Sequence, residues 1–244
     1  MEAFQDFIIL SVQAFRNVFR SPHYSSDIFL QMDIIGVGSL PIVMFTGFFS
    51  GIIMGMQMAR ALAMYGAQGQ VGQIVSITLV RELGPVLTAL LVTGRNASGI
   101  ASELGSMRVT EQIDAMRALG TDPIQKLVTP RLIATSVMLP LLTIISDCIG
   151  LFGGFLMAAS LMNITSSEYW TTAYRALAYN DVVQGLLKPL VFAIVIALVG
   201  CFYGMRTAGG TQGVGRATTK AVVVASLWIF VLTALIGRVF VFLT

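Results

Sequence analysis

The stretch IIGVGSLPIVMFTGFFSGIIMGMQMA, residues 34–59, decides the fold class because it contains no charged side chain. A helix needs about 20 apolar residues to cross a hydrocarbon core about 30 Å thick, so this stretch is long enough to span a membrane. The whole chain has the same character: 56% of its residues are hydrophobic, 11% are charged and the mean hydropathy is +0.83. Soluble proteins have about 25% charged residues, so the composition indicates an integral membrane protein.

Four further apolar stretches predict four more spanning helices, at about residues 72–106, 132–160, 188–205 and 220–242. Before the first span, residues 2–20 predict an amphipathic helix lying in the membrane interface. Its apolar side chains recur every three or four residues: Phe4, Phe7, Ile8, Val12, Phe15 and Phe19. We therefore expect an all-α membrane protein, with the interfacial helix and a connector at residues 1–30 and a transmembrane domain at residues 31–244.

Lysine and arginine are divided unevenly between the loops on the two sides of the membrane that five spans would create. With a cytoplasmic N-terminus, the inner segments contain Arg16, Arg20, Arg108, Arg117, Lys126, Arg131, Arg206, Arg216 and Lys220. The outer segments contain only Arg60, Arg175 and Lys188. Because cytoplasmic loops retain positive charge, we predict that the N-terminus is cytoplasmic and that the C-terminus lies outside. The net charge of +3 is explained by this asymmetry and gives no reason to expect nucleic acid as a partner.

Residues 106–123, SMRVTEQIDAMRALGTDP, gather charge between the second and third predicted spans. Thr110 can cap a short helix that has Glu111 in its first turn, and Gly120 marks the end of that helix. Its apolar face would consist of Val109, Ile113, Met116 and Leu119. A helix of this kind can either rest on the lipid surface or dock against another protein.

The chain shows no means of catalysis. Residues 210–217, GTQGVGRA, space their glycines like a P-loop, but Arg216 and Ala217 stand where lysine and serine or threonine are required. We interpret this segment as a flexible cytoplasmic turn. Cys148 and Cys201 lie in apolar segments and predict neither a disulfide nor a metal site. No nucleophile, base and orienting group can be assembled, so we expect a non-catalytic chain with no cofactor of its own.

Charged residues inside the predicted spans are the next informative feature, because they normally face a cavity or a partner. The second span carries Arg81, Glu82, Arg95 and Glu103. They either form pairs between helices and reach the interface, or they line a polar site. Pro85 frees a backbone carbonyl about one turn earlier, near Arg81, which favours a kink and a polar opening there. Asp147 in the third span is either a proton relay or a hydrogen-bonded group within the bundle.

Three stretches carry a resemblance to a known family. They are RELGPVLTALLVTGRNASGIASELGSMRVTEQIDAMRALGTDPI at 81–124, TPRLIATSVMLPLL at 129–142 and GRATTKAVVVAS at 215–226. Together they resemble the MlaE/YrbE family of ABC-transporter permeases over most of the chain from the first span onward. The chain departs from the family pattern at Asn96, at Ser102 and in its short N-terminal segment.

The resemblance implies the membrane subunit of a phospholipid transporter in the bacterial inner membrane, with the C-terminus periplasmic. Its partners would be a second copy of this chain, two cytoplasmic ATPase subunits that bind ATP and magnesium, and an MCE-domain lipid-binding protein outside. A small STAS-domain protein is a further expected partner. The segment at about 108–120 would then be the coupling helix that docks on the ATPase, through Thr110, Glu111, Asp114, Met116 and Arg117.

The resemblance also implies a lipid cavity that opens outward between the first two spans and is lined by the Arg-Glu-Leu-Gly-Pro motif. Leu62, Tyr65 and Leu83 would contact the acyl chains, Arg81 the phosphate, and Glu82 a headgroup cation or a neighbouring arginine. We expect both charged residues to face the cavity, so that Arg81→Ala and Glu82→Ala leave folding and dimer formation intact but reduce lipid copurification and transport. Loss of assembled protein would instead indicate that these charges neutralise a neighbouring helix.

Glycines four residues apart predict close helix contacts, either within one subunit or across a dimer. They occur at Gly47, Gly51 and Gly55 and again at Gly200 and Gly204. Five spans without an internal repeat require a second chain for a two-fold pathway, in agreement with a homodimer. An ion-driven secondary transporter and a structural membrane scaffold remain as alternatives. Copurification of an ATP-binding subunit discriminates against the secondary transporter, whereas a scaffold would bind partners but tolerate uncharged replacements at Arg81 and Glu82.

Overall fold

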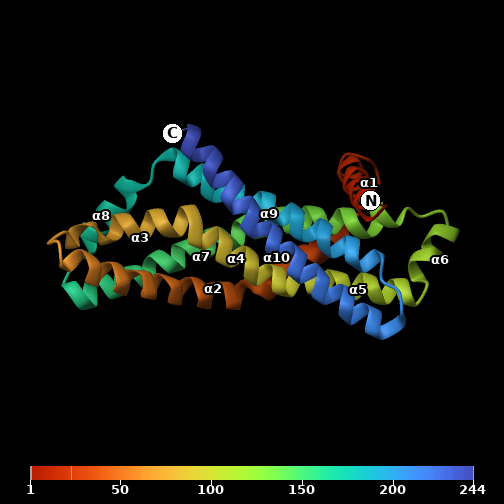
Figure 1. Cartoon of the computed structure of the whole chain (residues 1–244), viewed down its shortest axis with the longest axis horizontal. Helices are drawn as coiled ribbons and strands as arrows, with labels where there is room; N and C mark the ends of the chain where they lie inside the picture. Colours follow the sequence, from red (N-terminus) through yellow and green to blue (C-terminus); the bar gives the residue numbers. More distant parts are fainter. Residues whose placement is uncertain (1, 23, 244) are drawn as a thin grey trace. The chain divides into compact units, whose positions relative to one another are not determined.

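The computed structural model describes residues 2–22 and 24–243, and within these ranges the regular structure is helical (Figure 1). The α-helices are α1 (Glu2–Val18), α2 (Ser25–Ala63), α3 (Val71–Thr78), α4 (Gly84–Val92), α5 (Ser98–Val109), α6 (Gln112–Ala118), α7 (Thr129–Met162), α8 (Ser166–Ala176), α9 (Tyr179–Met205) and α10 (Gly210–Leu243). A short 3₁₀ turn, η1 (Gln68–Gln70), precedes α3, and three π-helical turns follow along the chain: η2 (Leu79–Leu83), η3 (Thr93–Ala97) and η4 (Ile124–Val128).

Five helical segments are long and apolar enough to cross a membrane, as predicted: Ser25–Ala63, Gln68–Val109, Ile124–Met162, Tyr179–Met205 and Gly210–Phe240. The fourth begins earlier than predicted, so Lys188 lies inside a span and not in an outer loop. The fifth begins at Gly210, so the predicted flexible turn at 210–217 is wrong. Only Gly209 and Gly210 of this region have a positive φ, and the glycines after them continue as helix.

The chain divides into two compact units, each built from three segments. Unit 1 contains Met1–Ser39, Leu90–Leu139 and Leu190–Leu232, and unit 2 contains Leu40–Ala89, Pro140–Pro189 and Thr233–Thr244. The long helices α2, α7, α9 and α10 contribute residues to both units. The boundary predicted after residue 30 falls inside α2 and does not coincide with this division.

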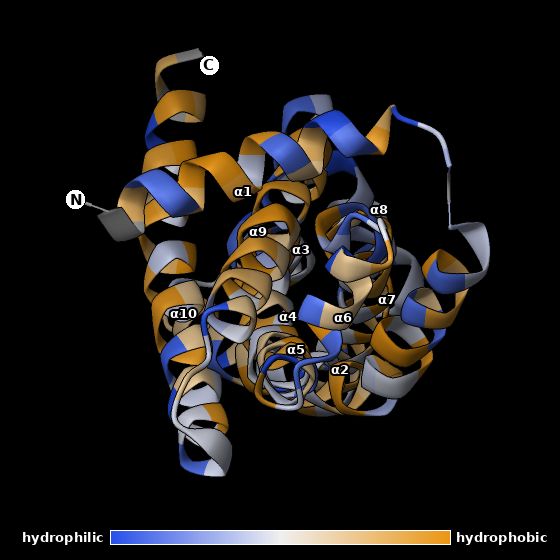
Figure 2. Ribbon diagram, turned by 90° about the vertical axis from the view of Figure 1, so that its right-hand side faces the viewer, coloured by the Kyte–Doolittle hydropathy of each residue, from blue (hydrophilic) through white to orange (hydrophobic). Residues whose placement is uncertain are grey.

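The core of unit 1 brings α1 and α6 together with the longer helices. Its buried members are Leu10, Ala14, Ile100, Leu104, Ile113, Leu127, Val128, Leu132, Ala197, Leu198 and Cys201. α1 therefore packs on the protein through Leu10 and Ala14, which the predicted apolar face did not include. Most of that predicted face, such as Phe4, Val12 and Phe19, is exposed, and hydrophobic and hydrophilic stretches alternate along the α1 ribbon (Figure 2).

The core of unit 2 contains Ala59, Val71, Val75, Leu79, Leu151, Ala158, Ile164 and Tyr169. α3 and α8 lie side by side (Figure 1), and the Ser76 hydroxyl donates a hydrogen bond to the Ala173 carbonyl at 3.1 Å. Tyr169, fully buried in α8, donates through its hydroxyl to the Leu151 carbonyl at 3.1 Å. Burial raises the pKa of the Tyr169 phenol, so its hydroxyl remains a donor at neutral pH.

The four-residue spacing of glycines in the first span is explained by a contact between two helices of the same chain. Gly47, Gly51 and Gly55 of α2 lie against Ser146, Gly150 and Gly154 of α7, and a β-carbon at Gly51 would overlap the Gly150 backbone. In unit 1, Gly200 and Gly204 of α9 approach α5 in the same way. Small residues thus let these helix pairs approach closely, and the glycines carry no information about a dimer.

Candidate substrate and coupling sites

The second span departs from α-helical geometry where Pro85 lies in its interior. A proline has no N–H, so the carbonyl four residues earlier, that of Arg81, loses its helical donor. The helix adjusts by the π-helical turn η2, and the Lys188 ammonium of α9 donates to the Arg81 carbonyl at 2.8 Å. The predicted freed carbonyl at Arg81 is confirmed, and its new donor comes from another span.

Four charged side chains gather around this turn in unit 2. The Arg81 Nε lies 3.4 Å from an Asp181 carboxylate oxygen, and the Lys188 Nζ lies 2.7 Å from the Glu82 Oε1. Gln184 donates to the same Glu82 oxygen at 3.4 Å. The Lys188 side chain is fully buried, whereas the exposed fractions are 45% for Glu82 and 34% for Arg81. The cluster is balanced in charge, and both residues of the predicted site keep surface that is open to a ligand.

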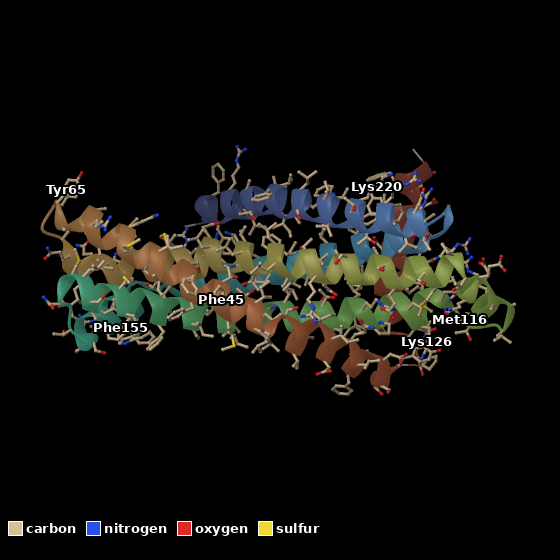
Figure 3. All side chains as sticks on the ribbon, turned by 90° about the horizontal axis from the view of Figure 1, so that it is seen from below. Phe45, Tyr65, Met116, Lys126, Phe155 and Lys220 are labelled. Atoms are coloured by element: carbon tan, nitrogen blue, oxygen red, sulfur yellow. The ribbon has the colours of Figure 1, made fainter. Side chains whose placement is uncertain are left out.

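The apolar residues of the predicted substrate site are only partly brought together. Leu62 and Leu83 both pack against the core of unit 2, whose buried residue Leu79 belongs to the same turn as Arg81 and Glu82. Tyr65 lies in the turn after α2 with its side chain extended away from the helices (Figure 3), and 84% of the residue is exposed. Tyr65 is therefore not part of this packed cluster.

Sequence analysis missed Asp181, Gln184 and Lys188, the three residues of α9 that complete the cluster. It assigned Lys188 to an outer loop and gave the other two no role. Their spacing is a signal that would have found them, because steps of three and four residues place polar side chains on one face of a helix. A hydropathy average cannot detect this face, since the surrounding apolar residues outweigh it.

Asp147 of α7 belongs to the same neighbourhood. Its carboxylate lies against Gly84, where a β-carbon would overlap Oδ1, so glycine is required at the start of α4. The buried Oδ1 has no hydrogen-bond partner among the described residues. The expected hydrogen bond within the bundle is therefore absent at this oxygen.

The short helix α6 connects α5 to η4 at one end of unit 1 (Figure 1). It begins at Gln112, after Glu111 in a left-handed conformation with φ of 59°. The predicted Thr110 cap is wrong, because the Thr110 hydroxyl donates to the Ser106 carbonyl of the preceding helix at 2.9 Å. The helix ends at Ala118, and Gly120 terminates it as predicted: with a positive φ, its N–H donates to the Arg117 carbonyl while that of Thr121 reaches the Met116 carbonyl, a Schellman motif.

The predicted coupling residues divide between the inside and the surface of α6. Ile113 is buried in the core of unit 1 and Met116 packs partly against it (Figure 3), so these two anchor the helix. Asp114 accepts from Arg108 at 2.5 Å and lies 3.4 Å from Arg117, which joins α6 to the end of α5. The predicted single apolar face is wrong at Leu119, which is 84% exposed and available to a partner, together with Glu111.

The inner charged residues of the second span behave differently from one another. Glu103 pairs with Arg131 of α7 at 2.7 Å, and the Arg131 side chain is only 4% exposed, so the expected pairing between helices is confirmed for Glu103. Arg95 has no ion pair among the described residues and is exposed. Nearby, Asn96 donates to the Thr135 hydroxyl at 3.1 Å, which links the same two helical segments.

These features define a multi-pass, all-helical membrane protein whose spans carry specific polar clusters. The family model Permease MlaE matches residues 28–239. The chain is 42% identical to a probable ABC transporter permease protein of Rickettsia bellii, over 96% of this chain and 90% of the relative. It is 41% identical to a probable ABC transporter permease of Synechocystis, over 91% and 84% of the two chains. It is 34% identical to the intermembrane phospholipid transport system permease protein MlaE of Haemophilus influenzae, over 84% of this chain and 80% of the relative.

The chain therefore belongs to the MlaE permease family, and it is a permease subunit of the ABC-transporter class. The resemblance noted in the motifs at 81–124, 129–142 and 215–226 is confirmed by matches over nearly the whole chain.

Proposed function

We propose that this permease moves phospholipids between the inner and outer membranes of a bacterium, and so helps to maintain lipid asymmetry. The observation that carries the proposal is the charged cluster at η2, where half-exposed Arg81 and Glu82 lie next to the apolar side chain of Leu83. A phospholipid is an amphiphile, and such a site offers a guanidinium for its phosphate beside apolar surface for its acyl chains. The phospholipid transport named for the Haemophilus influenzae relative supports this assignment.

A separate cytoplasmic ATPase would supply the energy, with ATP and magnesium bound in that partner. The exposed surface of α6, with Glu111, Arg117 and Leu119, is the surface proposed for its docking. Because Ile113 and Met116 anchor α6 in the core of unit 1, a push on this surface would be transmitted to α5 and η4. The full assembly would contain two copies of this chain, two ATPase subunits, an MCE-domain protein on the outer side and a small STAS-domain protein.

The test is lipid analysis of the complex after purification with its ATPase. Phospholipid should copurify with the wild-type complex, and Arg81→Gln should reduce both the bound lipid and lipid-stimulated ATP hydrolysis. Arg175→Gln is the matched control, because Arg175 is an exposed arginine of α8 outside the spans. A small polar solute in place of phospholipid would contradict the substrate, and absence of any copurifying ATPase would favour a secondary transporter. Unchanged activity after uncharged replacement of Arg81 and Glu82 would favour a scaffold.

A further inference from the structure

A cavity of about 300 Å³ lies in unit 1 beside Arg95. It is lined by Gln31, Ile34, Ile35 and Ser39 of α2 and by Arg95, Asn96, Gly99, Ile100 and Glu103 of the second span. Its volume is at the lower end of the range for small-ligand sites, about 300–1,000 Å³. The charged cluster at η2 contributes none of these residues, so the cavity is a separate site.

The charges around this cavity leave one positive charge without a counter-ion. Glu103 is occupied by Arg131, with which it forms an ion pair at 2.7 Å. Arg95 has no acidic partner among the described residues, although it lies within the second span. Because a charge inside a span is normally paired or solvated, this guanidinium is suited to an anion that enters from outside the chain.

A second, independent observation concerns Ser39. This residue is 1% exposed, lines the cavity, and its hydroxyl has no hydrogen-bond partner within the described part of the chain. Buried hydroxyls are normally satisfied, so the group is suited to donate to a ligand oxygen. Gly38, the preceding residue, lies directly against the guanidinium, where any β-carbon would overlap it. Because Gly38 has no side chain, the Arg95 guanidinium can occupy this position beside the cavity.

The surroundings of the cavity indicate the source of the anion. Ile34, one of the residues that line the cavity, is 48% exposed on a spanning helix, so part of the cavity wall is open apolar surface. A free ion would have to leave water to reach such a place, whereas a lipid keeps its acyl chains on the apolar surface while its headgroup enters the cavity. We propose that Arg95, Ser39 and the cavity they line bind the phosphate of a membrane phospholipid, at a site separate from Arg81 and Glu82.

The experiment measures lipid bound to purified, delipidated protein by native mass spectrometry. Dioleoylphosphatidylglycerol is the probe, and dioleoylglycerol, which has the same chains without the phosphate, is the comparison lipid. We expect Arg95→Gln to weaken phospholipid binding at one site about tenfold or more, as for loss of a charged hydrogen bond, and Arg95→Lys to weaken it less. Gly38→Ala, which displaces the guanidinium but keeps its charge, should also weaken binding, and Ser39→Ala should do so to a smaller extent.

Three further measurements keep the result decisive. Arg175→Gln controls for a general loss of positive charge. Thermal melting identifies variants that fail to fold, and if Arg95→Gln is one of them, Arg95→Lys is used for the binding measurement in its place. If Arg81→Gln and Arg95→Gln each lower the number of bound lipids by one and the double variant lowers it by two, the sites are separate. Normal lipid binding by Arg95→Gln would overturn this inference and leave the proposed function intact. Normal lipid binding by Arg81→Gln would contradict the proposed function and leave this inference intact.

Two other outcomes would also overturn the proposal. If inorganic phosphate displaces the lipid when present at the same concentration, the site binds a free anion and not a headgroup. If Arg95→Gln changes the oligomeric state but not the bound lipid, the guanidinium pairs with a second copy of the chain.

Discussion

Lys188 changes the interpretation of Glu82. Its ammonium is fully buried and has two acceptors, the Glu82 carboxylate and the Arg81 carbonyl that Pro85 leaves without a helical donor. A carboxylate that neutralises a buried cation contributes to stability as well as to any ligand site. The expectation that Glu82→Ala leaves folding intact therefore needs revision, because Lys188 would remain buried without a counter-ion.

We expect Glu82→Ala to lower the free energy of unfolding by about 2 kcal/mol, less than the cost for a fully buried pair because Glu82 is half exposed. Combining it with Lys188→Met should restore part of this loss, since the unpaired cation is then removed. Thermal melting of both single variants and the double variant in detergent measures the coupling. Additive losses would show that the two side chains do not interact.

Tyr169 supports unit 2 from α8 through a single buried hydrogen bond to α7. We expect Tyr169→Phe to cost about 1 kcal/mol, the usual net value of such a bond. Burial raises the phenol pKa above its ordinary value of 10.0, so the folded state holds the proton more tightly than the unfolded state. The contribution of Tyr169 to stability is complete below about pH 10 and is lost as the pH rises above it.

This pH effect is measured by comparing melting temperatures at pH 8 and pH 11 for Tyr169→Phe and the wild type. The variant should lose less stability at the higher pH. Tyr179→Phe is the matched control, because Tyr179 is 83% exposed. An identical loss in Tyr169→Phe and the wild type would show that this phenol does not contribute.

At the scale of elements, the seven residues of α6 both anchor the helix to unit 1 and carry part of the proposed docking surface. Its buried side, Ile113 and Met116, fixes the helix on unit 1, and the ion pair between Asp114 and Arg108 holds it to the end of α5. Reversing the charge of Asp114 would place one more cation beside Arg108 and Arg117 and disturb this junction. A test of docking must therefore change a side chain that the rest of the chain does not use.

Leu119→Asp meets this condition, because Leu119 is 84% exposed at the end of α6. If α6 docks on an ATPase, the substitution should reduce copurification of that subunit about tenfold, since it places a charge in an apolar contact, and should leave the melting temperature unchanged. Met64→Asp, at an equally exposed apolar residue after α2, should have no such effect. Equal copurification in both variants would leave α6 as a surface helix.

The pairing of α2 with α7 depends on the absence of side chains at their contact. Gly51→Ala would place a methyl group in the Gly150 backbone, so we expect a loss of about 1–3 kcal/mol, as for other overpacked sites. Gly215→Ala in α10 has open space around the new methyl group and should be neutral or slightly stabilising. Melting temperatures test the loss, and an unchanged oligomeric state in Gly51→Ala would agree with a contact inside one subunit.

At the scale of the whole molecule, the described residues contain five helical segments long and apolar enough to cross a membrane, and an odd number of crossings would place the two ends of the chain on opposite sides. The excess of basic residues on one set of loops predicts which side is cytoplasmic. Cysteines introduced at Ala115 and Thr171, both exposed, should label from the inside and the outside respectively, in a variant without the exposed Cys148. Labelling of both positions by an impermeant reagent added outside would contradict the predicted topology.

Sequence alone determined the class, the number of spans and the family. These properties depend on local composition and on motifs that are continuous along the chain, such as the charge-free residues 34–59 and the stretch at 81–124. It also predicted the freed carbonyl at Arg81, because the effect of Pro85 acts within one helical turn.

Only the tertiary structure decided which side chains meet. Lys188 and Asp181 lie about 100 residues from their partners in the sequence, and the glycines of α2 gained a defined contact only when α7 was placed beside them. The face by which α1 packs on unit 1 was likewise decided by its neighbours, because apolar residues on α1 are spread over more than one side. The physical reason is that hydropathy sums over adjacent residues, whereas an ion pair or a helix contact depends on two segments that only folding brings within a few ångströms.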